Sequence, residues 1–74
     1  MRADNTELNT RRHVGLRIKD ARTSIGMTRE AVATATGLSV SMVGQMERGE
    51  ANFSFSSLCG VATALGISVR GLMP

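Results

Sequence analysis

The sequence predicts an all-α fold, in which five short helices form one compact bundle. The only proline is the last residue, Trp and Tyr are absent, and the helix formers Ala, Leu, Met and Arg are plentiful. Apolar residues recur at intervals of three and four, and the sustained alternation of β-strands is absent. With 74 residues the chain has room for a single domain.

The first helix is expected to span Arg12 to Ile25. Its apolar residues follow at i, i+4, i+7 and i+11 and therefore share one helical stripe: Val14, Ile18, Ala21 and Ile25. Gly26 then suits a C-terminal cap. Residues 1–10 contain two acids, two asparagines and little to bury. We therefore expect a flexible N-terminal tail there and a folded domain over 11–74.

Two short helices joined by a tight turn are expected within residues 28–48. Thr28 can cap the first helix, which reaches about Thr36, and Ser39 can cap the second, which runs toward Arg48. Two helices that cross over such a turn leave room for a methyl group at their closest contact, and Ala33 supplies it. Apolar residues can fill the wedge between them: Val32, Leu38, Val43 and Met46. This pattern is typical of a helix-turn-helix.

Two more helices are expected in the last third of the chain. Ser54 or Ser56 can cap the fourth, whose apolar residues fall at i, i+3, i+4 and i+7: Leu58, Val61, Ala62 and Leu65. Gly66 closes it, and Ser68 can open one last turn through Leu72.

Composition favours a binding protein with an anionic partner. The net charge is +3 and the pI is about 10.5. A single thiol, Cys59, forms no internal disulfide, and no signal peptide or membrane-spanning stretch is seen, so we expect a cytoplasmic protein. Paired carboxylates, metal-ligand spacing and a Gly-rich phosphate loop are all lacking. We therefore expect no catalytic residue, no metal and no cofactor.

A family resemblance rests on the stretch GMTREAVATATGLSVSMVGQMERG and the segments on either side of it. From Gly15 to Leu72 the chain resembles the Xre/Cro-type helix-turn-helix domain of phage lambda-class repressors. The segment VGQMERGEANFS is especially similar to the controller proteins of restriction-modification systems. The resemblance implies a lambda-repressor-like five-helix domain. It also implies a transcriptional regulator that binds a pseudopalindromic double-stranded operator as a homodimer.

The helix over about 39–48 is expected to enter the major groove, because a helix fits that groove and its N-terminal side chains reach base edges. Gln45 is the strongest base-reading candidate, since its amide pairs bidentately with adenine. The expected base contacts are Ser39, Val40, Ser41, Met42, Gly44 and Gln45. Arg29 stands where the family has a glutamine, and we expect it to meet a phosphate. The expected phosphate contacts are Arg12, Thr28, Arg29, Arg48 and Asn52.

Two further sets of residues are expected to be structural. The resemblance implies a partly buried salt bridge between Arg22 and Glu47, which ties the first helix to the third. Dimerisation is expected because one recognition helix makes few contacts, and two half-sites one DNA turn apart roughly double the interaction energy. The apolar residues assigned to that interface are Phe55, Cys59, Ile67, Val69, Leu72 and Met73.

Two other functions compete with DNA binding. A helical module that binds a protein partner, as an antitoxin or adaptor does, would account for the weak reading surface at Val40 and Gly44. An enzyme would have only His13 and Cys59 to work with. Repression and activation are not distinguished by the sequence. Activation would need a surface that touches RNA polymerase, and Glu30, Glu50 and the N-terminal acids are available for it.

Overall fold

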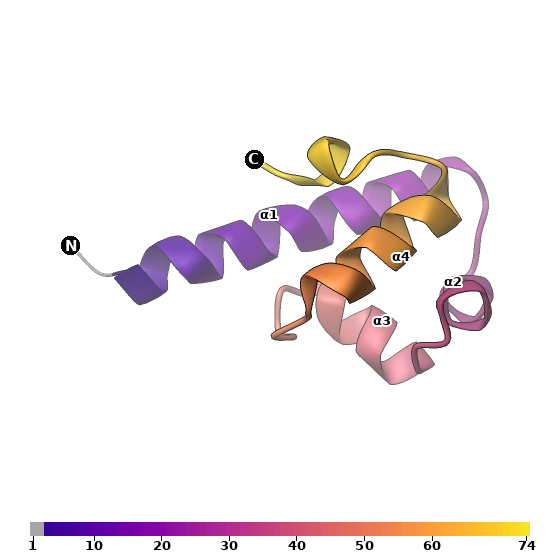
Figure 1. The fold of residues 1–74 in the computed structure, drawn as a ribbon, viewed down its shortest axis with the longest axis horizontal. Coiled ribbons are helices and arrows are strands. Elements are labelled where there is room, and N and C mark those ends of the chain that lie inside the picture. Colours follow the sequence, from indigo (N-terminus) through magenta and orange to yellow (C-terminus); the bar gives the residue numbers. More distant parts are fainter. Residues whose placement is uncertain (1–2) are drawn as a thin grey trace.

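The computed structural model describes the backbone of residues 3–74 and the side chains from Thr6 onward (Figure 1). Four α-helices and one 3-10 helix follow one another: α1 (Ala3–Ser24), α2 (Arg29–Thr36), α3 (Val40–Glu47), α4 (Phe55–Leu65) and η1 (Val69–Leu72). The all-helical fold class is confirmed. The expected fifth helix is instead a single 3-10 turn. Its backbone bonds, Gly71 N–H to Ser68 O and Met73 N–H to Arg70 O, close over three residues instead of four.

Helix α1 begins nine residues earlier than the sequence predicts, at Ala3 instead of Arg12. Residues 3–10, expected as a flexible tail, are therefore helical in the structure. Local interactions explain the difference. Glu7 and Arg11 form an ion pair one turn apart, and the Thr10 hydroxyl donates to the Thr6 carbonyl over 3.0 Å. This part of α1 projects beyond the other helices in Figure 1.

The core lies where the four α-helices and η1 meet. Its fully buried side chains are mainly aliphatic: Val14, Ile18, Val32, Val43, Met46, Val61 and Leu72. Ile25, which was expected on the buried stripe of the first helix, follows the end of α1 at Ser24 and is exposed. Among the described helices, none is both long enough and apolar enough to cross a membrane.

The contact between α1 and α3 depends on Gly15, which is buried in the middle of α1. A Cβ built on Gly15 would overlap the Met46 carbonyl oxygen and would lie only 2.5 Å from the Glu47 carbonyl oxygen. Backbone therefore packs directly against backbone at this position. The close approach fixes the C-terminal end of α3 against α1.

The turn between α2 and α3 has capping groups on both sides. Gly37 has a φ of 76° and donates its N–H to the Ala33 carbonyl over 2.9 Å. The Ser39 hydroxyl then accepts the N–H of Met42 over 3.0 Å and begins α3. Thr28 caps α2 in the same way, through the N–H of Ala31. These caps set the direction of α3, which carries the candidate reading surface.

Candidate nucleic-acid interface

The outward face of α3 is polar and uncharged at its N-terminal end. Val43 and Met46 point into the core, whereas Ser39, Val40 and Ser41 are exposed, Val40 at 42%. Gln45 is half-buried and its Nε2 lies 3.5 Å from the Ser41 Oγ. Met42 is half-buried and packs against the core. Five of the six predicted base contacts are therefore exposed or half-buried. Because Met42 packs against the core, four of them lie on the outward face of α3: Ser39, Val40, Ser41 and Gln45.

Gly44 lies on the outward side of α3, as expected, but it is not open to a ligand. It is buried, because the Arg48 side chain folds back along α3 and covers it. A Cβ built on Gly44 would lie 3.1 Å from Arg48 Nη1. The Arg48 Nε donates to Glu50 Oε1 over 3.0 Å, and both of these side chains are more than half exposed. The Arg48 side chain thus forms the solvent-exposed surface above Gly44.

Beside the reading face, α1, α2 and α3 enclose an open cavity of about 360 Å³. Three of its residues come from one face of α1, and the others come from the start of α2 and the end of α3. It is lined by Arg12, Leu16, Lys19, Arg29, Glu47 and Arg48. Four of these six side chains are cations, and Leu16 gives the wall an exposed apolar part. A cationic hollow of this kind suits a phosphate of a nucleic-acid backbone.

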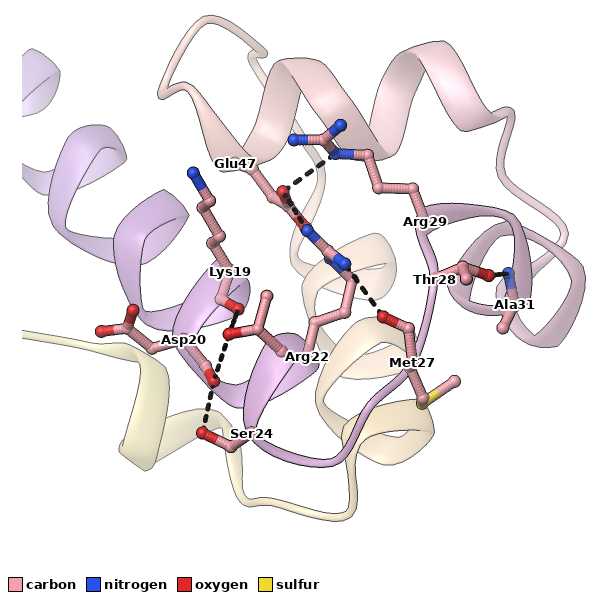
Figure 2. Close-up of polar contacts among 10 residues, drawn as sticks. Lys19, Asp20, Arg22, Ser24, Met27, Thr28, Arg29, Ala31 and Glu47 are labelled. Carbon is pink, nitrogen blue, oxygen red and sulfur yellow. Dashed lines mark hydrogen bonds and ion pairs between the residues drawn. The ribbon is translucent and has the colours of Figure 1, made fainter.

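Glu47 is the only acidic residue that lines this cavity, and its carboxylate is shared by two arginines (Figure 2). Arg22 donates from Nε to Oε2 over 2.5 Å and from Nη2 to Oε1 over 3.2 Å. Arg29 donates from Nε to Oε1 over 3.1 Å. The Glu47 side chain is 1% exposed. One buried carboxylate therefore connects α1, the start of α2 and the end of α3.

The ionisation of this cluster follows from its contacts. Burial acts to raise the pKa of Glu47, but the hydrogen bonds and the positive charges of Arg22 and Arg29 outweigh it, so the pKa is lowered. The hydrogen bond to Glu47 raises the pKa of Arg22. Glu47 is therefore a carboxylate and Arg22 a cation across the physiological pH range.

Arg29 has two roles in this geometry. Its Nε is bound to Glu47, whereas its two terminal nitrogens lie beyond that bond in Figure 2. The side chain is 41% exposed. Glu47 therefore holds the guanidinium in place and leaves donors available at the cavity. A glutamine here would lack the charge.

Three of the five predicted phosphate contacts meet at the cavity, namely Arg12, Arg29 and Arg48. Thr28 is exposed next to Arg29, and Asn52 is exposed in the loop between α3 and α4.

Two residues that line the cavity, Leu16 and Lys19, are absent from all the site residues predicted from the sequence. Their spacing from Arg12, at i, i+4 and i+7, shows in the sequence that the three share one helical face.

The residues assigned to a dimer interface do not all reach the surface. Phe55 is 72% exposed and Met73 is 39% exposed. Cys59, Ile67 and Val69 are half-buried. Leu72 is fully buried, because η1 turns it back onto the core. The assignment of Leu72 to an interface is therefore wrong.

A short helix, a capped turn and a second helix with a polar outer face, flanked by cations, define a helix-turn-helix protein. A helix-turn-helix family model (HTH_3) matches residues 18–72. The chain belongs to this family, the Xre/Cro type of helix-turn-helix, whose members are DNA-binding regulators.

Solved structures with this fold include two restriction-modification controller proteins. The chain is 38% identical to C.AhdI from Aeromonas hydrophila, with a TM-score of 0.82, over 85% of this chain and 96% of that one. It is 29% identical to a point mutant of C.Esp1396I, with a TM-score of 0.73, over 78% and 73% of the two chains. It is 31% identical to the clp gene regulator ClgR from Corynebacterium glutamicum, with a TM-score of 0.79, over 84% and 80%. No curated protein matches the chain.

Proposed function

We propose that this protein is a transcriptional regulator that binds a pseudopalindromic operator in double-stranded DNA as a homodimer. The observation that carries the proposal is the difference in charge between the outward face of α3 and the adjoining cavity. The reading end of α3 is polar and uncharged, and four cations line the cavity beside it. Uncharged hydrogen-bonding groups suit base edges, and cations suit the sugar-phosphate backbone.

In this proposal the outward face of α3, from Ser39 to Gln45, lies in the major groove. Gln45 is positioned to pair with an adenine through its amide, and Ser41 supports it from one turn earlier. Val40 is exposed enough to pack on a thymine methyl group. Met42 is left with a supporting role because most of it packs inward.

The phosphate backbone is held on the flank of α3 in the same proposal. Arg12, Lys19 and Arg29 surround the cavity, and Thr28 and Asn52 add exposed hydrogen-bonding groups outside it. Each phosphate that a cation neutralises contributes about 0.9 to the slope of log K against log salt concentration. Binding is therefore expected to weaken steeply with salt.

The homodimer is proposed from exposed apolar surface. Phe55 and Met73 expose large apolar groups at the start of α4 and after η1. Half-buried Cys59, Ile67 and Val69 complete the set. A two-fold pair would present two recognition helices to half-sites about 34 Å apart.

The relatives suggest a narrower role. C.AhdI, which the chain covers almost completely, is a restriction-modification controller protein. We propose the same role here, in the cytoplasm and without catalysis. The free thiol of Cys59 suits a reducing compartment. Repression and activation both fit this proposal, the latter through RNA polymerase at exposed acids such as Glu30.

The test is selection of bound sequences from a random duplex pool at about 0.15 M salt, which suppresses non-specific phosphate binding. Wild type is compared with Gln45→Ala and with Thr23→Ala, an exposed position at the end of α1. A two-fold symmetric motif that Gln45→Ala relaxes at one base per half-site, and that Thr23→Ala leaves intact, supports the proposal. Failure of folded wild type to enrich any motif refutes it in favour of a protein-binding module.

A further inference from the structure

The recognition helix has a gap in its outward face. Gly44 lies one turn from both Val40 and Arg48, on the side of α3 that also carries Ser41 and Gln45. Glycine is a poorer helix former than alanine in a helix interior. The helix therefore gives up stability at a position that contributes no side chain of its own to the surface.

Arg48 occupies this gap. Long side chains on a helix lean toward its N-terminus, and the Arg48 guanidinium accordingly lies over Gly44 instead of at the end of the helix. A Cβ at Gly44 would lie 3.1 Å from Nη1 and 3.9 Å from both Cζ and Nη2. Only glycine leaves this space completely free. The missing side chain thus brings a cation onto the reading face.

Glu50 orients the same guanidinium. It accepts the Nε–H of Arg48 over 3.0 Å, and both side chains remain more than half exposed. With Nε bound, the remaining donors belong to Nη1 and Nη2, which lie on the side of α3. Two N–H groups in a planar fork match the O6 and N7 acceptors of guanine in the major groove.

We infer that Arg48 reads a guanine in each operator half-site, with Gly44 providing its space and Glu50 orienting it. Arg48 is the only cation among residues 39–48, and it is held over the face that Ser41 and Gln45 share. The other three cations of the cavity come from α1 and α2, outside the recognition helix, and are placed for phosphates. This inference rests on the proposed function and replaces the phosphate contact expected for Arg48 from the sequence.

Phosphate oxygens also accept hydrogen bonds from a guanidinium, so the experiment must separate the two contacts. Sequence selection and salt-dependent binding are measured for wild type, Arg48→Gln, Gly44→Ala and Lys19→Ala. The inference predicts a guanine in the wild-type motif whose replacement weakens binding roughly 5- to 150-fold. Arg48→Gln removes that preference and leaves the preference read by Gln45. Lys19→Ala keeps every preference and lowers affinity equally for all sequences.

Gly44→Ala tests the role of the space above Gly44 separately from the charge of Arg48. Its methyl group crowds Nη1, which must shift by a few tenths of an ångström, while it adds helix propensity. A thermal melt by circular dichroism therefore shows a folded protein, and selection shows a weakened guanine preference. An unchanged preference in this variant overturns the role of Gly44. If Arg48→Gln lowers affinity uniformly and reduces the salt slope by about 0.9, Arg48 contacts a phosphate and the inference is wrong. If wild type enriches no motif, the proposed function itself fails.

Discussion

Replacing Glu47 by Gln removes one negative charge from the point where α1, α2 and α3 are joined. The amide of Gln has the shape of the carboxylate, but only one of its two terminal atoms accepts hydrogen bonds, whereas both carboxylate oxygens do. It carries no charge to neutralise Arg22, whose side chain is only 11% exposed, or Arg29. The variant therefore leaves a nearly buried cation without its counter-ion.

The expected cost follows from this burial. Breaking a buried ion pair by removing one partner costs about 3–5 kcal/mol. A domain of 74 residues has a total free energy of unfolding of roughly 4–11 kcal/mol. Glu47→Gln is therefore expected to remove at least a quarter of the stability and to lower Tm by roughly 12 °C or more.

Urea denaturation followed by circular dichroism measures this loss, and its pH dependence identifies the cause. The pKa of Glu47 is lowered in the folded state, so its ion pairs contribute fully above the unfolded pKa of about 4.3. The contribution is lost as pH falls through the folded-state pKa. The difference between wild type and Glu47→Gln should stay constant from about pH 8 to pH 5 and shrink below about pH 4.

Glu50→Gln is the matched control, because Glu50 also pairs with an arginine but at the surface. Exposed pairs contribute about 0–1 kcal/mol, so this variant should keep most of the stability. The reasoning is refuted if Glu47→Gln unfolds within about 1 kcal/mol of wild type, or if its deficit is the same at pH 3 as at pH 7.

Other substitutions test the packing, the interface and the cavity. Gly15→Ala should destabilise the protein in thermal melts, because its methyl group overlaps two backbone carbonyls of α3. The control is Gly60→Ala, whose new methyl group would meet its nearest neighbour atom at 3.9 Å. This variant should raise stability by up to about 1 kcal/mol. Leu72→Ala should cost about 2–5 kcal/mol of folding free energy at any protein concentration. Phe55→Ser should instead raise the dissociation constant of the proposed dimer in sedimentation experiments, and equal effects of both variants on folding and association would contradict this division. Lys19→Ala should lower the salt slope of DNA binding by about 0.9, and an unchanged slope would exclude Lys19 from phosphate contact.

The sequence predicts the order of the helices well because their ends are set locally. Thr28, Ser39 and Ser68 accept backbone N–H groups within three residues, and Gly66 adopts the left-handed conformation that ends α4. The extension of α1 to Ala3 was not predicted, because a helix there buries little and depends on weak contacts between exposed side chains. Apolar periodicity detects buried faces only.

The candidate site is less predictable than the fold. The polar face of α3 follows from the spacing of Val43 and Met46, which turn inward. The position of the Arg48 guanidinium does not follow, because a long side chain selects its rotamer from the groups around it, here Glu50 and the space above Gly44. The second arginine on Glu47 likewise depends on how α2 is placed against α3.

The cations lie away from the N-terminal end of α3, and this separation affects how substitutions can change the DNA target of such a protein. Residues 31–46 contain no charged side chain, and the cations stand on α1, at the start of α2 and at the end of α3. In the proposed complex, non-specific attraction to DNA, which governs sliding and search, therefore comes mainly from the cations on α1 and α2. Of the cations of the cavity, Arg48 alone is also proposed to choose a base. Substitutions at Val40, Ser41 or Gln45 can redirect the protein to a new operator while its rate of encounter with DNA stays the same.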